Sequence, residues 1–189
     1  SIAETLAPEE LVNLLNVYLT QMTDKVFAHD GLLDKYIGDA IMAVYGAPIP
    51  HPDHARRACH TAVDMLRELD RLRADWKARG LPQMDIGIGI NTGPMIVGNM
   101  GSKNRFDYTV IGDAVNLASR IEGLNKNYGT HILITESTWR AVKDEFPNTR
   151  EIDVVQVRGH QEQTRLYEIM LPEHYPHMDW LPEFARGLE

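Results

Sequence analysis

The stretch DKYIGDAIMAVYGAP, residues 34–48, places a Gly-Asp pair in the middle of an apolar run. Strands use both residue types sparingly, so Gly38 and Asp39 predict the tight turn of a hairpin. A carboxylate that projects from such a rigid corner suits a divalent metal, although Gly-Asp is also a favourable turn dipeptide in its own right. Lys35, four residues before Asp39, could serve either an ion pair or a ligand.

The second stretch with chemical content is RFDYTVIGDAVNLASRIEG, residues 105–123. We predict a strand followed by a helix that Asp113 caps by accepting from the first free amides. Asn116 and Arg120 are spaced i and i+4, so they share one face of that helix. Beside Thr109 on the incoming strand, this amide and guanidinium could position a sugar and a polyphosphate, because arginine offers a fixed fork of donors. A solvated helix face is the other interpretation.

The elements that must hold these residues alternate between helices and strands. Apolar spacing and helix end signals predict helices at residues 8–29, 52–80, 114–124 and 136–144. Turn signals and β-favouring residues predict strands at 32–37, 40–46, 84–91, 94–99, 106–111, 131–135, 152–158 and 164–170. This order predicts an α/β fold, an α+β sandwich in which helices cover one face of a mostly antiparallel sheet, with a ferredoxin-like βαββαβ core and added C-terminal strands.

Composition bounds the class of protein. A chain of 189 residues with 43% hydrophobic and 24% charged residues fits one ordinary domain, which we place at residues 1–171 ahead of a tail at 172–189. The net charge of −8 argues against nucleic-acid binding. The single cysteine, Cys59, excludes an internal disulfide and fits a small core residue in a reducing compartment. Apolar runs fall short of the roughly 18 residues that span a bilayer, so we expect a cytoplasmic domain.

Two further motifs carry less weight. GIGINTG, residues 87–93, superficially resembles a glycine-rich phosphate loop. Its glycines alternate with isoleucine inside a predicted strand, and another strand follows instead of a helix, so we do not expect a Rossmann or P-loop site. HPDH, residues 51–54, has two histidines at a spacing compatible with a metal but no evident third ligand, and we interpret both as surface residues.

Three segments resemble the signature blocks of class III nucleotidyl cyclases of the bacterial adenylyl cyclase type. They are DKYIGDAIMAVYGAP, IGINTGPMIVGNMGS and YTVIGDAVNLASRIE, and they occur in the family's order within about residues 1–170. The resemblance implies a homodimer in which two catalytic domains pair head to tail, with shared active sites in the groove between them. It also implies that ATP is converted there to cyclic AMP and pyrophosphate.

The resemblance assigns a role to each matching residue. Asp39 corresponds to the second of two aspartates that bind two Mg²⁺ or Mn²⁺ ions. Lys35 and Thr109 correspond to the pair that reads adenine, which guanylyl cyclases typically replace with Glu and Cys. Asn116 corresponds to the residue that orients the ribose, and Arg120 to the residue that stabilises the transition state.

The sequence departs from the family pattern at some positions. Arg158 stands where many members have a phosphate-binding lysine, and it keeps the positive charge. Thr109, where many animal cyclases have Asp, resembles the subgroup that includes bicarbonate-responsive enzymes. The family's first metal aspartate corresponds to a position ahead of Ser1, so we expect the chain as printed to be catalytically incomplete. We also expect regulatory domains elsewhere in a longer protein, which a membrane tether could anchor. The alternative is a degenerate cyclase-like module that binds nucleotide or a partner without turnover.

Overall fold

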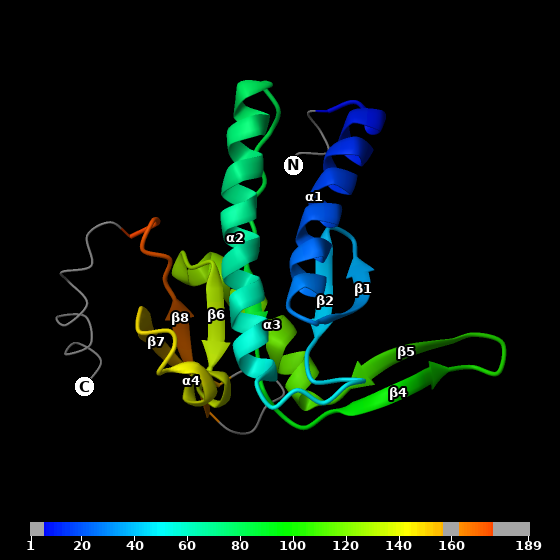
Figure 1. Ribbon diagram of the computed structural model, residues 1–189, viewed down its shortest axis with the longest axis vertical. Coiled ribbons are helices and arrows are strands. Elements are labelled where there is room, and N and C mark those ends of the chain that lie inside the picture. Colours follow the sequence, from blue (N-terminus) through cyan, green and yellow to red (C-terminus); the bar gives the residue numbers. More distant parts are fainter. Residues whose placement is uncertain (1–5, 157–162, 176–189) are drawn as a thin grey trace. The chain divides into compact units, whose positions relative to one another are not determined.

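The computed structural model describes residues 6–156 and 163–175 (Figure 1). The chain divides into two compact units, Ser1–Ile86 and Gly87–Glu189. Within the described ranges, no helix is both long and apolar enough to cross a membrane.

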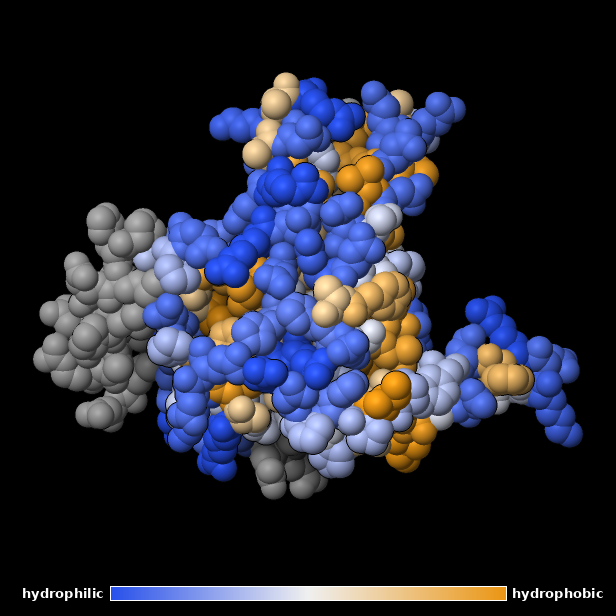
Figure 2. Space-filling view, in the orientation of Figure 1, coloured by the Kyte–Doolittle hydropathy of each residue, from blue (hydrophilic) through white to orange (hydrophobic). Residues whose placement is uncertain are grey.

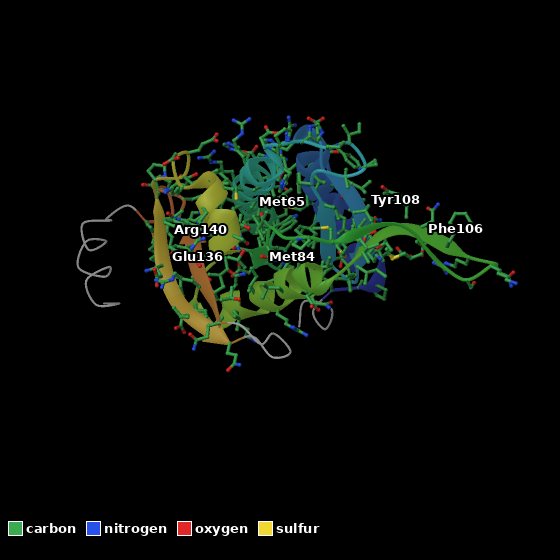
Figure 3. All side chains as sticks on the ribbon, turned by 90° about the horizontal axis from the view of Figure 1, so that it is seen from below. Met65, Met84, Phe106, Tyr108, Glu136 and Arg140 are labelled. Carbon is green, nitrogen blue, oxygen red and sulfur yellow. The ribbon has the colours of Figure 1, made fainter. Side chains whose placement is uncertain are left out.

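The first unit is built on two long helices, α1 (Pro8–Ala28) and α2 (His54–Ala78). Their apolar residues recur at helical spacing and meet in one core, which consists of Leu14, Tyr18, Met22, Leu69, Leu72, Trp76 and Met84. Figure 2 shows hydrophobic atoms gathered between the two helices, and Figure 3 labels Met65 and Met84 among these side chains. Each large apolar side chain that is fully buried contributes about 1.5–3 kcal/mol, so this core is the main source of stability for the unit.

A hairpin completes the first unit. Strands β1 (Leu32–Ile37) and β2 (Ala40–Val44) follow α1 and precede α2 in the sequence. The two strands pair with each other in antiparallel orientation. Cys59 is fully buried in α2, as predicted for a small core residue.

The second unit contains a four-stranded sheet of order β3-β6-β8-β7 and a separate pair, β4-β5. Among the described strands of this unit, β3 and β6 run parallel and the remaining neighbours are antiparallel. The strands are β3 (Ile88–Ile90), β4 (Ile96–Gly101), β5 (Phe106–Ile111), β6 (Ile132–Thr135), β7 (Thr149–Gln156) and β8 (Gln163–Ile169), and the helices are α3 (Asp113–Tyr128) and α4 (Glu136–Val142). The predicted fold class, an α+β arrangement with mostly antiparallel strands, is confirmed. Within residues 6–156 and 163–175, ladder hydrogen bonds divide the strands into three sheets.

One predicted strand is wrong in length. The strand expected at residues 84–91 is reduced to β3, which pairs with β6, whereas the following strand β4 pairs with β5. Arg73 on α2 accounts for the difference, because its Nε donates to the Met84 carbonyl at 2.8 Å and its Nη2 to the Asp85 carboxylate at 2.6 Å. Met84 also packs into the core of the first unit. Residues 84 and 85 therefore contact α2 and do not pair with a described strand.

The end of α3 also differs from the prediction. The helix continues four residues past the expected end at residue 124, to Tyr128. Gly123 does not interrupt it, and Gly129, with φ of +64°, adopts the left-handed conformation that ends many helices.

Candidate active site

Asp39 lies in a two-residue turn at the tip of the β1–β2 hairpin. Ile37 and Ala40 pair directly, which leaves Gly38 and Asp39 as the connection. Gly38 has φ of +65°, a conformation that glycine adopts without steric cost. The Asp39 side chain is exposed. The prediction of a tight turn that presents a carboxylate is confirmed.

Lys35 lies beside an irregularity in the same ladder. The register shifts between Leu33 and Lys35, which makes Asp34 a bulge residue, and bulges re-aim side chains that would otherwise alternate between faces. The Asp34 side chain is 1% exposed, and its Oδ2 lies 3.3 Å from Lys35 Nζ. Of the two roles left open for Lys35, an ion pair is present, with Asp34. Asp34 was not among the predicted site residues, because neighbours in a regular strand point to opposite faces and the ion pair depends on the bulge.

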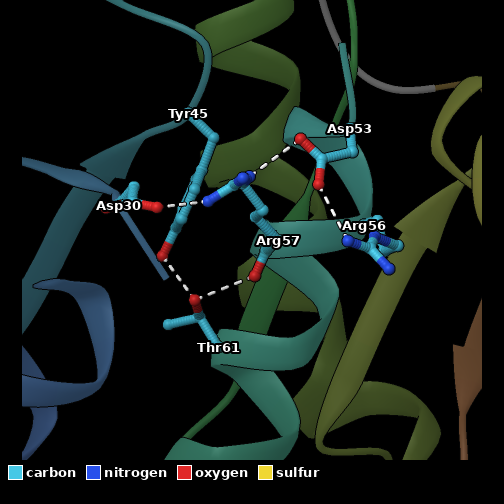
Figure 4. A network of polar contacts seen from close by, with 6 residues as sticks. All are labelled: Asp30, Tyr45, Asp53, Arg56, Arg57 and Thr61. Atoms are coloured by element: carbon cyan, nitrogen blue, oxygen red, sulfur yellow. Dashed lines mark hydrogen bonds and ion pairs between the residues drawn. The ribbon is translucent and has the colours of Figure 1, made fainter. Parts of the chain in front are cut away.

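Arg57 and Thr61 tie the two ends of this hairpin to α2 (Figure 4). The Arg57 guanidinium donates to Asp30, which precedes β1 and has φ of +56°, and its Nε donates to Asp53 at 2.8 Å. The Arg57 carbonyl accepts a hydrogen bond of 2.9 Å from the Thr61 hydroxyl. That hydroxyl in turn accepts from the Tyr45 hydroxyl, just after β2, at 2.7 Å. Two residues of α2, Arg57 and Thr61, therefore hold the entry and the exit of the segment that carries Lys35 and Asp39.

The contacts of Arg57 and Thr61 with Asp30, Asp53 and Tyr45, here called the Arg57 clamp, depend on the protonation states of their partners. Hydrogen bonds from Arg57 and then Arg56 hold the pKa of the Asp53 carboxyl well below its usual range. Burial raises the pKa of the Tyr45 hydroxyl to about 12, so it stays protonated and able to donate near neutral pH.

The hairpin is also attached to α1. The hydroxyls of Tyr36 and Thr23 are 2.9 Å apart, although the Tyr36 side chain is otherwise exposed. Burial, followed by the negative charge of Asp39, raises the pKa of Tyr18 on α1 to about 12. The negative charge of Asp39 therefore acts on the Tyr18 hydroxyl of α1.

In the second unit, Thr109 lies on β5 and pairs with Gly98 on β4. Paired residues share a face of the ladder, as do residues two apart along a strand, so Ile96 and Ile111 lie on the face of Thr109. These isoleucines are 72% and 56% exposed. The half-buried Thr109 thus lies on a face of the strand pair that also exposes two isoleucines.

Asn116 and Arg120 are both exposed on α3, as the i and i+4 spacing predicted for one shared face. The buried residues of this helix are Leu117, Ile121 and Asn125. The expected cap by Asp113 is wrong, because Gly112 is the N-cap, with φ of +156°, and no side chain caps the helix. Asp113 is instead the first helical residue, where its charge favours the helix dipole.

The glycines of GIGINTG have a packing role. A Cβ at Gly89 would lie 2.4 Å from both the Ala118 carbonyl oxygen and the Glu122 amide nitrogen, so only glycine permits this approach of α3 to β3. A Cβ at Gly93 would lie 2.9 Å from that of Ala114. These contacts seat α3 against the sheet.

Among the described residues, Asp39 is the candidate metal ligand. They contain no group of three or more His, Cys, Asp or Glu side chains arranged to hold an ion, which also leaves the HPDH histidines without further ligands. Asp39, an exposed carboxylate at a rigid turn, nevertheless fits one ligand of Mg²⁺ or Mn²⁺. Proteins bind Mg²⁺ through one or two carboxylates together with substrate phosphates and water.

The predicted site residues are divided between the units. The hairpin of the first unit carries Lys35 and Asp39, and the β5–α3 segment of the second carries Thr109, Asn116 and Arg120. Arg158 lies outside the described residues, as do residues 176–189 of the predicted tail.

Comparison with known proteins gives a consistent result. The family described as "Adenylate and Guanylate cyclase catalytic domain" matches residues 1–170. The chain is 42% identical to an adenylate cyclase of Anabaena cylindrica over 177 residues, which is 89% of the chain and 34% of that protein. Overall, it spans a quarter to a third of the length of the curated relatives that it matches first.

Solved structures agree. The adenylyl cyclase CyaB from P. aeruginosa is similar with a TM-score of 0.82 and 34% identity, covering 89% of this chain and 86% of that one. The guanylyl cyclase Cya2 is similar with a TM-score of 0.77 and 36% identity, covering 88% and 83%. Solved neighbours of both substrate types thus share the fold.

Proposed function

The chain belongs to the adenylate and guanylate cyclase catalytic domain family, and on that premise we propose that it is the adenylyl cyclase domain of a longer protein. The reaction converts ATP to 3',5'-cyclic AMP and pyrophosphate by in-line attack of the ribose 3'-oxygen on the α-phosphorus. The observation that carries the proposal is the exposed Asn116–Arg120 pair, held on a helix seated against the sheet. A module that only bound nucleotide would have no need for a transition-state arginine.

Arg120 binds the α-phosphoryl group and Asn116 binds the ribose. Arg120 donates to the oxygens of the α-phosphoryl group as negative charge develops there, an interaction stronger in the transition state than in the ground state. Asn116 orients the ribose so that the 3'-oxygen lies in line with the bond that breaks. Arg158 contributes positive charge toward the triphosphate.

Lys35 and Thr109 select the base. The Lys35 ammonium donates to adenine N1, and the Thr109 hydroxyl accepts from the exocyclic amine. Guanine presents the reverse pattern at these edges, so its N1–H would face the Lys35 ammonium donor to donor, whereas the Thr109 hydroxyl could turn and donate to O6. This chemistry favours ATP, whereas some solved neighbours of the chain are guanylyl cyclases.

Asp39 would hold the divalent ions, with its partner carboxylate supplied from upstream of Ser1. When bound, two Mg²⁺ or Mn²⁺ ions would lower the pKa of the ribose 3'-hydroxyl and neutralise the triphosphate and the leaving pyrophosphate. The Arg57 clamp and the Tyr36–Thr23 contact keep the hairpin that presents Asp39 in place.

A homodimer completes the site. We propose that each active site takes its metal carboxylates from one chain and Lys35, Thr109, Asn116, Arg120 and Arg158 from the other. The β4–β5 pair supports this arrangement, because it exposes large apolar residues on both faces: Ile96 and Ile111 on the face of Thr109, and Phe106 and Tyr108 on the opposite face. Phe106 and Tyr108 are labelled on β5 in Figure 3.

The direct test is cyclic AMP formation by the full-length protein. Activity should require Mg²⁺ or Mn²⁺ and stop on chelation. Arg120→Ala should lower kcat by about 10²–10³-fold, because one charge-assisted contact to the transition state is lost. Ser119→Ala, at the neighbouring exposed position of α3, is the matched control and should keep full activity. Undiminished turnover by Arg120→Ala would remove the arginine from the reaction, and nucleotide binding without any turnover by the parent protein would indicate a binding module.

A further inference from the structure

A side-chain network joins the ends of β3 and β6 to the first turn of α3. Asn91, directly after β3, donates from Nδ2 to the carbonyl of Ala114 at 2.9 Å. Its Oδ1 accepts from the Thr135 hydroxyl at 2.7 Å and from the Ser137 hydroxyl at 3.2 Å. Asn91 therefore uses its donor toward α3 and its acceptor toward β6 and α4.

The rest of the network is satisfied internally. The hydroxyls of Thr92 and Thr138 are 3.0 Å apart, and Ser137 reaches the Thr92 carbonyl at 2.8 Å. Thr135 and Thr138 are 2% and 0% exposed. Because these buried polar groups bond to one another, the network serves to hold backbone segments together and not to bind a ligand.

Asn91 is one of two asparagines that tie α3 to β3. Near the other end of the helix, Asn125 donates to the Ile88 carbonyl at 3.1 Å and accepts from the Thr130 hydroxyl at 2.9 Å. The close approach at Gly89 lies between these two ties. The tie made by Asn91 is the one near the proposed site residues, because Ala114 is two residues before Asn116 and six before Arg120.

We propose that Asn91 is a positioning residue for the cyclisation reaction. Its bond to the Ala114 carbonyl sets the place of the first turn of α3, and through that turn the place of Asn116 and Arg120. This inference rests on the proposed function. A displacement of about 1 Å in groups that orient a reacting atom can cost about 100-fold in rate, so the loss of one such bond is measurable.

The test compares two variants of the full-length protein that break different bonds of the same network. Asn91→Asp keeps the oxygen that accepts from Thr135 and Ser137 but replaces the donor with an anionic oxygen that repels the Ala114 carbonyl. Ser137→Ala removes a bond to Asn91 without touching α3. The number of competent sites is first measured by titration with 3'-deoxy-ATP, which lacks the attacking hydroxyl. Dividing the rate by the number of competent sites separates an effect on catalysis from a loss of folded protein, because misfolding lowers the number of sites and leaves the rate per site unchanged.

We expect kcat per competent site to fall by about 10- to 100-fold in Asn91→Asp and to stay within about twofold in Ser137→Ala. The affinity for 3'-deoxy-ATP should change little in either. Asn91→Ala, a further variant at the same position that introduces no charge, should show the same loss. A rate per site at the parental level in the folded Asn91 variants, or an equal loss in Ser137→Ala, would overturn the positioning role.

Arg120→Ala, measured alongside, separates the two proposals. If Arg120→Ala keeps its activity, the proposed function fails whatever Asn91 does. If Arg120→Ala is inactive while both Asn91 variants match the parent, only the positioning role fails.

Discussion

At the scale of single residues, Lys35 and Thr109 carry the proposed preference for adenine. A Lys35→Glu, Thr109→Cys double variant reverses the pattern of donors and acceptors, so we expect the ratio of kcat/KM for ATP over GTP to fall by about tenfold or more. The measurement is the rate of formation of each cyclic nucleotide over a range of substrate concentrations. The control is Lys77→Glu, Ser119→Cys, which makes the same replacements at two exposed positions outside the proposed site. An unchanged ratio in the first variant would show that these two residues do not read the base.

Residue by residue, the sequence predicted what depends on local structure. Gly38 and Asp39 could be placed in a turn because both disfavour strands, and the shared exposure of Asn116 and Arg120 follows from helical spacing. The ion pair between Asp34 and Lys35 could not be predicted, because it depends on a bulge and therefore on the register between two strands.

At the scale of elements, the close packing of α3 against β3 requires glycine at position 89. Gly89→Ala should lower the free energy of unfolding by about 1–3 kcal/mol or more, because the new Cβ would overlap backbone atoms of Ala118 and Glu122 that cannot give way. Gly123→Ala within α3 is the matched control, because its Cβ would meet nothing within 4 Å. This second change should stabilise the protein by up to about 1 kcal/mol through helix propensity. Urea unfolding measures both, and equal effects of the same sign would contradict the close approach of α3 to β3.

Elements were predictable where the pattern was long and local. The two long helices of the first unit follow directly from leucine spacing. The strand expected at residues 84–91 was wrong because Arg73, eleven residues before Met84, takes up the Met84 carbonyl that a ladder would need. No local pattern in residues 84–91 shows that contact.

At the scale of the whole molecule, the chain spans only a quarter to a third of the relatives that it matches first. We propose that the remainder of the protein supplies regulation and that the catalytic domain works as a homodimer. The exposed isoleucines beside Thr109 fit this proposal, since a residue proposed to read the base would then lie next to a surface that a second chain covers.

Mixing two inactive variants tests the shared site most directly. In the full-length protein, Asp39→Ala and Arg120→Ala should each be nearly inactive as homodimers. In a heterodimer, one groove combines both lesions while the other receives intact metal ligands and an intact arginine. Random pairing makes about half of the dimers mixed, each with one working site of two, so cyclic AMP formation should recover to roughly a quarter of the parental rate. Two different affinity tags confirm that heterodimers have formed after co-expression. Recovery near a quarter is the predicted result, and confirmed heterodimers as inactive as either parent would contradict an active site built from two chains.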